Sequence, residues 1–116
     1  MRRVLVLIHS SRSNTRALAA ELEAIAARAP DDLEVKAELA TAYGALGSWE
    51  RATEQLEAIA LARSPDVALL VRIGDGHRRQ GDLDAALAWY GRASMIAPDS
   101  TLPGFLIAQA LLDAGK

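Results

Sequence analysis

The sequence predicts an all-α fold in which helix–turn–helix hairpins stack into a solenoid. Gly47, Gly81 and Gly115 lie 34 residues apart, and a fixed period of this length is typical of stacked helical repeats. Small residues keep the same period, at Ala40, Gly74 and Ala108. Apolar residues make up 51% of the chain but aromatic residues only 4%, which favours helices that pack closely through small side chains.

The overall composition limits the class of protein. With 116 residues the chain has the length of one domain, and its net charge of −2 does not favour a nucleic-acid partner. The absence of cysteine excludes disulfides and cysteine–metal sites. No apolar run approaches the roughly 18 residues of a membrane span. The apolar run Val4–Ile8 is shorter than a secretory core of about 7–15 residues, so we expect no signal peptide and favour a cytoplasmic location.

Residues 1–32 are expected to form a degenerate first repeat. An amphipathic pattern predicts a helix over Thr15–Arg28 with Asn14 as its cap, followed by Pro30. Counting back by the period makes Arg2–Ser11 the other helix of this repeat, although Ser13 stands where the turn glycine is expected. An arm that pairs with another chain is an alternative for this segment.

A second alternative for the same segment is a flavin site. Val4–Ile8 reads as a buried strand, and the hydroxyl-rich stretch after it resembles the phosphate-binding turn of flavodoxins. That resemblance implies a small flavin-binding protein. However, a parallel-sheet flavin fold needs several strands, and no second strand is evident after Ile8.

Residues 33–66 form the first complete repeat. Apolar residues at helical spacing predict a helix from Val35 that ends near Gly44 and Gly47. Ser48 is expected to cap a second helix from Trp49 to about Arg63.

Residues 67–100 repeat this plan. Asp66 caps a helix over Ala68–Arg79, which Gly81 ends. Asp82 then caps a helix over Leu83–Ile96. Small residues at matching positions allow two helix backbones to approach closely; they are Ala40 and Gly74 on the first helices, and Ala52 and Ala86 on the second.

The second repeat resembles a tetratricopeptide repeat. The family pattern asks for residues that are here Gly74, Gly81, Ala86, Tyr90, Ala93 and Pro98, and only His77 replaces an expected aromatic residue. With the first repeat and a partial third, the resemblance covers Leu33–Lys116. It implies a right-handed solenoid that binds a partner protein in the concave groove lined by its first helices.

The resemblance also implies which side chains line that groove. They are Glu34 and Thr41 in the first repeat; Val71, Asp75, Arg78 and Arg79 in the second; and Leu102, Phe105 and Gln109 in the third. The groove would be basic in the middle and apolar at one end. A peptide or helix with an acidic residue beside an apolar anchor would suit it, as for an adaptor or assembly scaffold.

Residues 101–116 are expected to form a partial repeat or a capping helix. Apolar residues surround most of this helix, including Leu102, Phe105, Leu106 and Leu112, whereas a capping helix should have one polar face. Either the chain is a fragment of a longer array, or this side meets another molecule. A self-associating scaffold joined through its terminal helices is therefore the alternative function.

No group of residues predicts an enzyme, a cofactor or a metal site. His9 and His77 are the two histidines, and His77 occupies a position expected to pack in the core. Asp31, Asp32, Asp82 and Asp84 lie at expected helix starts, where carboxylates satisfy free backbone N–H groups. The serines near the start lack a histidine–acid pair at recognisable spacing.

Overall fold

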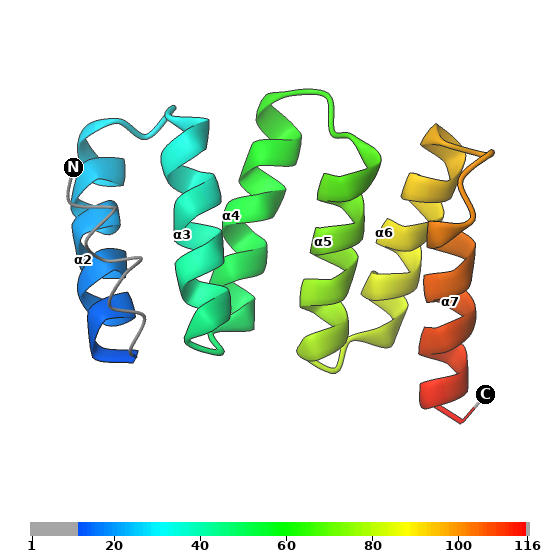
Figure 1. Cartoon of the computed structure of the whole chain (residues 1–116). Coiled ribbons are helices and arrows are strands. Elements are labelled where there is room, and N and C mark those ends of the chain that lie inside the picture. The colour runs from blue at the N-terminus through cyan, green and yellow to red at the C-terminus, as the bar shows by residue number, and fades with distance from the viewer. Residues whose placement is uncertain (1–11, 116) are drawn as a thin grey trace.

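The protein is a row of α-helices (Figure 1). The computed structural model describes residues 12–115, and within this range it contains helices and no strand, which confirms the all-α prediction for these residues. The helices are α2 (Arg12–Arg28), α3 (Leu33–Ala45), α4 (Trp49–Ala62), α5 (Val67–Arg79), α6 (Leu83–Ile96) and α7 (Leu102–Asp113).

Each helix packs against the helix before it and the helix after it in the chain. The molecule measures 43 × 29 × 21 Å, and its Cα radius of gyration is 15.3 Å. A compact domain of this length would have a radius of about 13 Å. The chain is therefore elongated along the row of helices that Figure 1 shows.

The core is divided into three groups of buried residues that follow one another along the row. The first joins α2, α3 and α4 around Leu22, Leu39 and Tyr43. The second joins α3, α4 and α5, and consists of Ala40, Leu56, Ile59, Leu69 and Ile73. The third joins α5, α6 and α7, and consists of Leu70, Val71, Ala86, Tyr90, Ala93 and Ala110. Because each group involves three consecutive helices, burial is shared between neighbours rather than gathered in one centre.

The periodic glycines end the first helix of each hairpin, as predicted. Gly47, Gly81 and Gly115 have φ angles of 77°, 85° and 76°, and they are the residues of the described range with positive φ. This left-handed backbone costs about 1–2 kcal/mol for a residue with a Cβ atom. Glycine therefore recurs every 34 residues because each of these helix ends has a left-handed backbone, which glycine adopts without strain.

Aspartates cap three helix starts, as expected. Asp32 accepts hydrogen bonds from the backbone N–H groups of Glu34 and Val35 at 3.0 and 3.3 Å. Asp66 accepts one from Leu69 at 2.8 Å. Asp82 accepts one from Ala85 at 3.1 Å. These bonds satisfy backbone donors that have no partner within the helix.

One expected cap is confirmed in its position only, and another is wrong. Ser48 occupies the capping position of α4, but its side chain makes no capping hydrogen bond. Asn14 lies inside α2, because that helix begins at Arg12. The helix proposed for Arg2–Ser11, the rival strand over Val4–Ile8 and His9 lie outside the described residues.

Close approach of neighbouring helices depends on two glycines of α5. A Cβ atom on Gly74 would lie 2.6 Å from the ring of Tyr90 on α6, which is fully buried. A Cβ atom on Gly76 would overlap the hydroxyl of Thr53 on α4 and lie 3.2 Å from its Cβ. The role predicted for Gly74 is therefore confirmed, and Gly76 has an equivalent role on the opposite side of the helix.

Candidate functional site

The main candidate site is a groove where α3, α4 and α5 meet. Three polar residues of α5, Arg72, Asp75 and Arg79, recur at three- and four-residue intervals, which puts them on one face of the helix. The hollow between the three helices has a volume of about 240 Å³. We call it the α5 groove; its lining residues are Ala40, Trp49, Ala52, Thr53, Leu56, Arg72, Asp75, Gly76 and Arg79.

Two further hollows adjoin the α5 groove and share Arg79 with it. One, of about 520 Å³, lies at the α3–α4 turn and is lined by Gly47, Ser48, Trp49, Glu50, Arg51, Arg79 and Gln80. The other, of about 410 Å³, is lined by Asp75, Arg78 and Arg79. Arg79 thus stands where all three hollows join, which makes it the central residue of the candidate site.

An aromatic ring holds Arg79 in place. The Arg79 Cζ lies 4.6 Å from the centroid of the Trp49 ring, within the range of a cation–π interaction. Arg79 itself is exposed. The guanidinium is therefore positioned by α4 while its edges remain accessible to a ligand.

The single carboxylate of the α5 groove is engaged from α6. The Tyr90 hydroxyl donates a hydrogen bond to Asp75 Oδ1. Burial, the hydrogen bond to Asp75 and its negative charge raise the pKa of Tyr90 to about 12. Asp75 keeps its negative charge when it accepts this bond, so the two arginines and one carboxylate of the α5 groove together carry one net positive charge.

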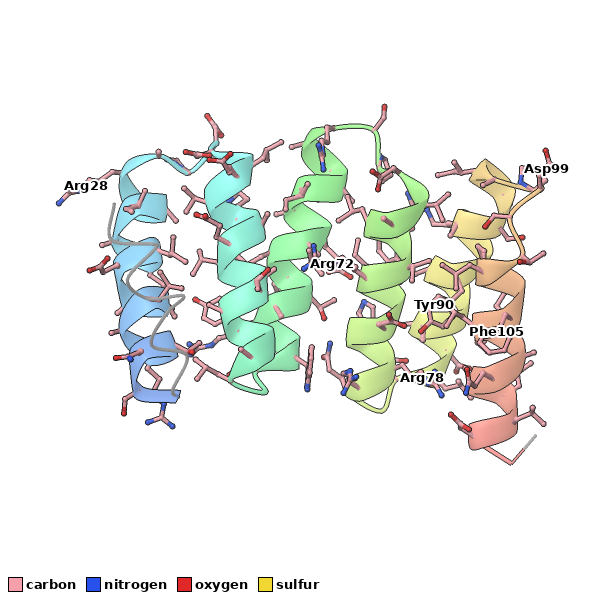
Figure 2. All side chains as sticks on the ribbon, viewed as in Figure 1. Arg28, Arg72, Arg78, Tyr90, Asp99 and Phe105 are labelled. Atoms are coloured by element: carbon pink, nitrogen blue, oxygen red, sulfur yellow. The ribbon has the colours of Figure 1, made fainter. Side chains whose placement is uncertain are left out.

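Arg78 of α5 forms an ion pair with a residue at the end of α7. Its guanidinium donates to Asp113 Oδ2 at the end of α7, and the side chain is 28% exposed. Figure 2 shows Arg72 and Arg78 on α5, with Arg72 beside α4. Arg78 therefore links α5 to α7, and Arg72 and Arg79 are the exposed cations of the α5 groove.

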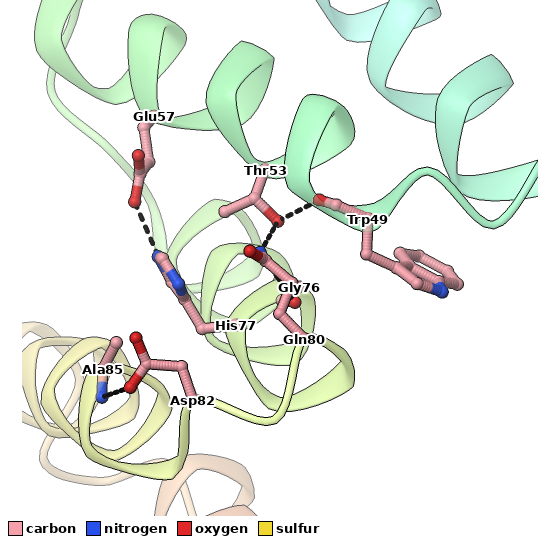
Figure 3. Close-up of polar contacts among 8 residues, drawn as sticks. All are labelled: Trp49, Thr53, Glu57, Gly76, His77, Gln80, Asp82 and Ala85. Carbon is pink, nitrogen blue, oxygen red and sulfur yellow. Dashed lines mark hydrogen bonds and ion pairs between the residues drawn. The ribbon is translucent and has the colours of Figure 1, made fainter.

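Partly buried hydrogen bonds connect the helices beneath the α5 groove (Figure 3). The Thr53 hydroxyl donates to the Trp49 carbonyl oxygen at 2.7 Å. The same oxygen of Thr53 accepts from Gln80 Nε2 at 3.2 Å, and that amide also donates to the Gly76 carbonyl at 3.1 Å. These bonds connect α4 to the end of α5, so the two helices present their side chains to the groove in a fixed arrangement.

His77 of α5 packs against α4 on one side and α6 on the other. Its ring stacks on Trp89 of α6, with centroids 6.4 Å apart and an interplanar angle of 12°. Its Nε2 lies 2.7 Å from Glu57 Oε2 of α4 (Figure 3). The packed position expected for His77 is therefore confirmed.

The structure brings together only part of the predicted set of groove residues. Asp75, Arg78 and Arg79 lie next to one another, as described above. Glu34 is exposed in the first turn of α3 and does not line the three hollows. Thr41 is exposed and donates its hydroxyl to the Ala37 carbonyl of its own helix at 3.2 Å.

Val71 was expected in the groove and lies in the core instead. It is only 9% exposed and packs with Leu70, Ala86 and Tyr90 between α5, α6 and α7. The side chain of Val71 points toward α6 and α7 and therefore away from the groove. Its neighbour Arg72 lines the α5 groove in its place.

The predicted residues of α7 form a separate surface. Leu102 and Phe105 are 47% and 61% exposed, and Gln109 is exposed as well. None of the three lines the hollows around Arg79. Figure 2 shows Phe105 on α7, on the far side of α6 from the α5 groove.

Two groove residues were missed from the sequence. Arg72 could have been found, because it lies seven residues before Arg79 and three before Asp75, a spacing that puts all three on one helix face. Trp49 was expected as the first residue of a helix, and no sequence signal connects it to Arg79, thirty residues later.

Two further features were sought in the described part of the chain, a metal-binding group and a membrane-spanning helix. Within residues 12–115, no group of histidine and acidic side chains could hold a metal ion. None of the described helices is long and apolar enough to cross a membrane.

Comparison with known proteins adds no family. A scan against models of protein families finds no match to this chain, and a search of curated proteins finds no significant similarity.

Proposed function

We propose that this chain is a non-catalytic protein–protein interaction module that binds an acidic peptide or helix of a partner in the α5 groove. One observation carries the proposal. Two exposed arginines from one face of α5 border a hollow whose wall includes the Trp49 ring, and that ring positions Arg79.

The chemistry of these side chains favours a carboxylate ligand. An arginine presents a planar set of N–H donors that matches the two oxygens of a carboxylate. Stacking on Trp49 restricts the Arg79 side chain before the ligand arrives, so less conformational entropy is lost on binding. Apolar atoms of Ala40, Ala52 and Leu56 line the same hollow and suit an apolar side chain beside the acidic one.

The wider architecture we infer is a right-handed solenoid of the tetratricopeptide type. The 34-residue period, the left-handed glycines and the packing of each helix on its neighbours in the chain support it. Such a scaffold offers a preformed surface, which suits an adaptor or an assembly module.

A defined peptide panel tests this function. We would display acidic, neutral and basic peptides of equal length, each with one central leucine, and measure their affinities by fluorescence polarisation. The groove variant is Arg72→Glu/Arg79→Glu. The matched control is Arg28→Glu/Arg63→Glu, which changes two exposed arginines outside the three hollows and alters the net charge equally.

We expect the wild type to select acidic peptides and the groove variant to bind them at least about tenfold more weakly, which corresponds to about 1.4 kcal/mol. The control should lose less than about twofold. Equal losses in both variants would mean that net charge and not the groove attracts the peptides. No preference for acidic peptides would contradict the proposal.

A further inference from the structure

One face of α7 corresponds to a face of α5 that is buried by the next helix. Shifted by the 34-residue period, Leu70, Val71 and Gly74 of α5 become Gly104, Phe105 and Ala108 of α7. In α5 all three residues are buried, and Gly74 lies directly against Tyr90 of α6. In α7 their counterparts are all exposed.

The opposite face of α7 is already occupied. Pro103, Ile107 and Ala110 correspond to Leu69, Ile73 and Gly76, the face that α5 turns toward α4. Pro103 and Ala110 are buried, and Ile107 packs against the group of buried residues shared with α6.

Helix α7 therefore packs on α6 in the way that α5 packs on α4. The face of α7 that corresponds to the α6-binding face of α5 is uncovered.

The uncovered face is strongly apolar. Phe105 is 61% exposed and Leu112 is 74% exposed, and Gly104 and Ala108 add no polar side chain. Covering large side chains such as these removes apolar surface from water, which stabilises a complex. We call the surface of Gly104, Phe105, Ala108 and Leu112 the α7 docking face.

We propose that the α7 docking face binds an amphipathic α-helix of a partner, in the way that α5 binds α6 within the chain. This surface is distinct from the α5 groove and does not depend on the function proposed for it.

The two hairpins within the chain indicate which helix fits. In one hairpin Gly74 faces Tyr90, and a Cβ atom at this glycine would lie 2.6 Å from the ring. In the other hairpin the corresponding residues are Ala40 and Leu56, which share one buried group. The docking face has Ala108 at this position, so its Cβ atom excludes an aromatic ring and accepts leucine. The partner helix should therefore resemble α4 rather than α6.

The experiment uses a peptide with the sequence of residues 48–63, which includes α4, as the probe. A staple joining positions 50 and 54, both exposed in α4, holds it helical and reduces the ordering cost. Its affinity for the full chain is measured by fluorescence polarisation. A second probe carries Leu56→Tyr.

Three chain variants accompany the wild type. Phe105→Asp changes the docking face at an exposed side chain, Met95→Asp changes an apolar side chain of α6 that is 81% exposed, and Ala108→Gly mimics Gly74.

We expect the first probe to bind the wild type and the Met95→Asp control equally, and to bind Phe105→Asp at least tenfold more weakly. The Leu56→Tyr probe should bind the wild type at least tenfold more weakly than the first probe does, and Ala108→Gly should recover most of that loss. Three results would overturn the proposal: no binding of the first probe, binding that Phe105→Asp leaves unchanged, or sedimentation showing that a second copy of the chain covers this face instead.

Discussion

The contact between Gly74 and Tyr90 gives a prediction that the structure makes quantitative. The Gly74→Ala change would place a methyl group 2.6, 2.7 and 3.2 Å from three atoms of a ring that is fully buried. Real Cβ atoms essentially never lie within 3.0 Å of such a neighbour, and most of their contacts are longer than 3.4 Å, so the Tyr90 ring or the two helices would have to shift by roughly half an ångström or more. Overpacking of this kind costs about 1–3 kcal/mol, and here we expect about 3 kcal/mol.

A second effect of the same change has the opposite sign. Alanine is more favourable than glycine inside a helix by about 1 kcal/mol. The net expectation for Gly74→Ala is therefore a loss of about 2 kcal/mol in the free energy of unfolding. Gly91→Ala in α6 is the matched control, because a Cβ atom there meets nothing within 4 Å, and it should gain up to about 1 kcal/mol.

A double-mutant cycle separates the steric effect from other causes. Tyr90→Leu alone should cost about 2–3 kcal/mol, because it leaves a cavity and removes the hydrogen bond to Asp75. The double variant Gly74→Ala/Tyr90→Leu reproduces the pairing of Ala40 with Leu56 in the other hairpin. It should be more stable than the sum of the single changes by about 2–3 kcal/mol.

The assay is urea unfolding followed by circular dichroism at constant pH and temperature. The reasoning is refuted if the two changes are additive, or if Gly74→Ala stabilises the chain as Gly91→Ala does.

The remaining predictions concern helix ends and pH. Asp66→Ala should cost about 1 kcal/mol by urea unfolding, because it removes a capping hydrogen bond, whereas Ser48→Ala should cost little, since the serine makes none. Gly81→Ala should cost about 1–2 kcal/mol in the same assay, because φ is 85° there; a neutral effect would contradict the backbone argument. Burial and a carboxylate partner raise the pKa values of Tyr43 and Tyr90 from 10.0 to about 12. Since the folded state favours the neutral phenols, their contribution to stability is complete below pH 10 and is lost between pH 10 and 12. Ultraviolet absorbance of the phenolate should show both tyrosines titrating near 12 in the folded chain; titration near 10 would contradict this.

The sequence alone determined the features that depend on local backbone chemistry. The period of Gly47 and Gly81 predicted where helices end, because only glycine takes a left-handed backbone without strain. Asp66 and Asp82 predicted two helix starts for a similarly local reason, since a capping carboxylate bonds to N–H groups within a few residues of itself. The bounds predicted for the helix Leu83–Ile96 are those that the structure has.

Only the tertiary structure decided which side of each helix lies in the core or lines the groove, and which residues of other helices contact it. Adjacent residues of one helix point in directions about 100° apart, so the rotation of α5 about its own axis decides whether Val71 or Arg72 lies in the groove. The packing of α5 against α4 and α6 fixes that rotation. It also brings Trp49 to Arg79 and Thr53 to Gly76, pairs far apart in the sequence. A helical period predicts that a face exists, but the direction of that face is set by the neighbouring helices, and no local pattern encodes it.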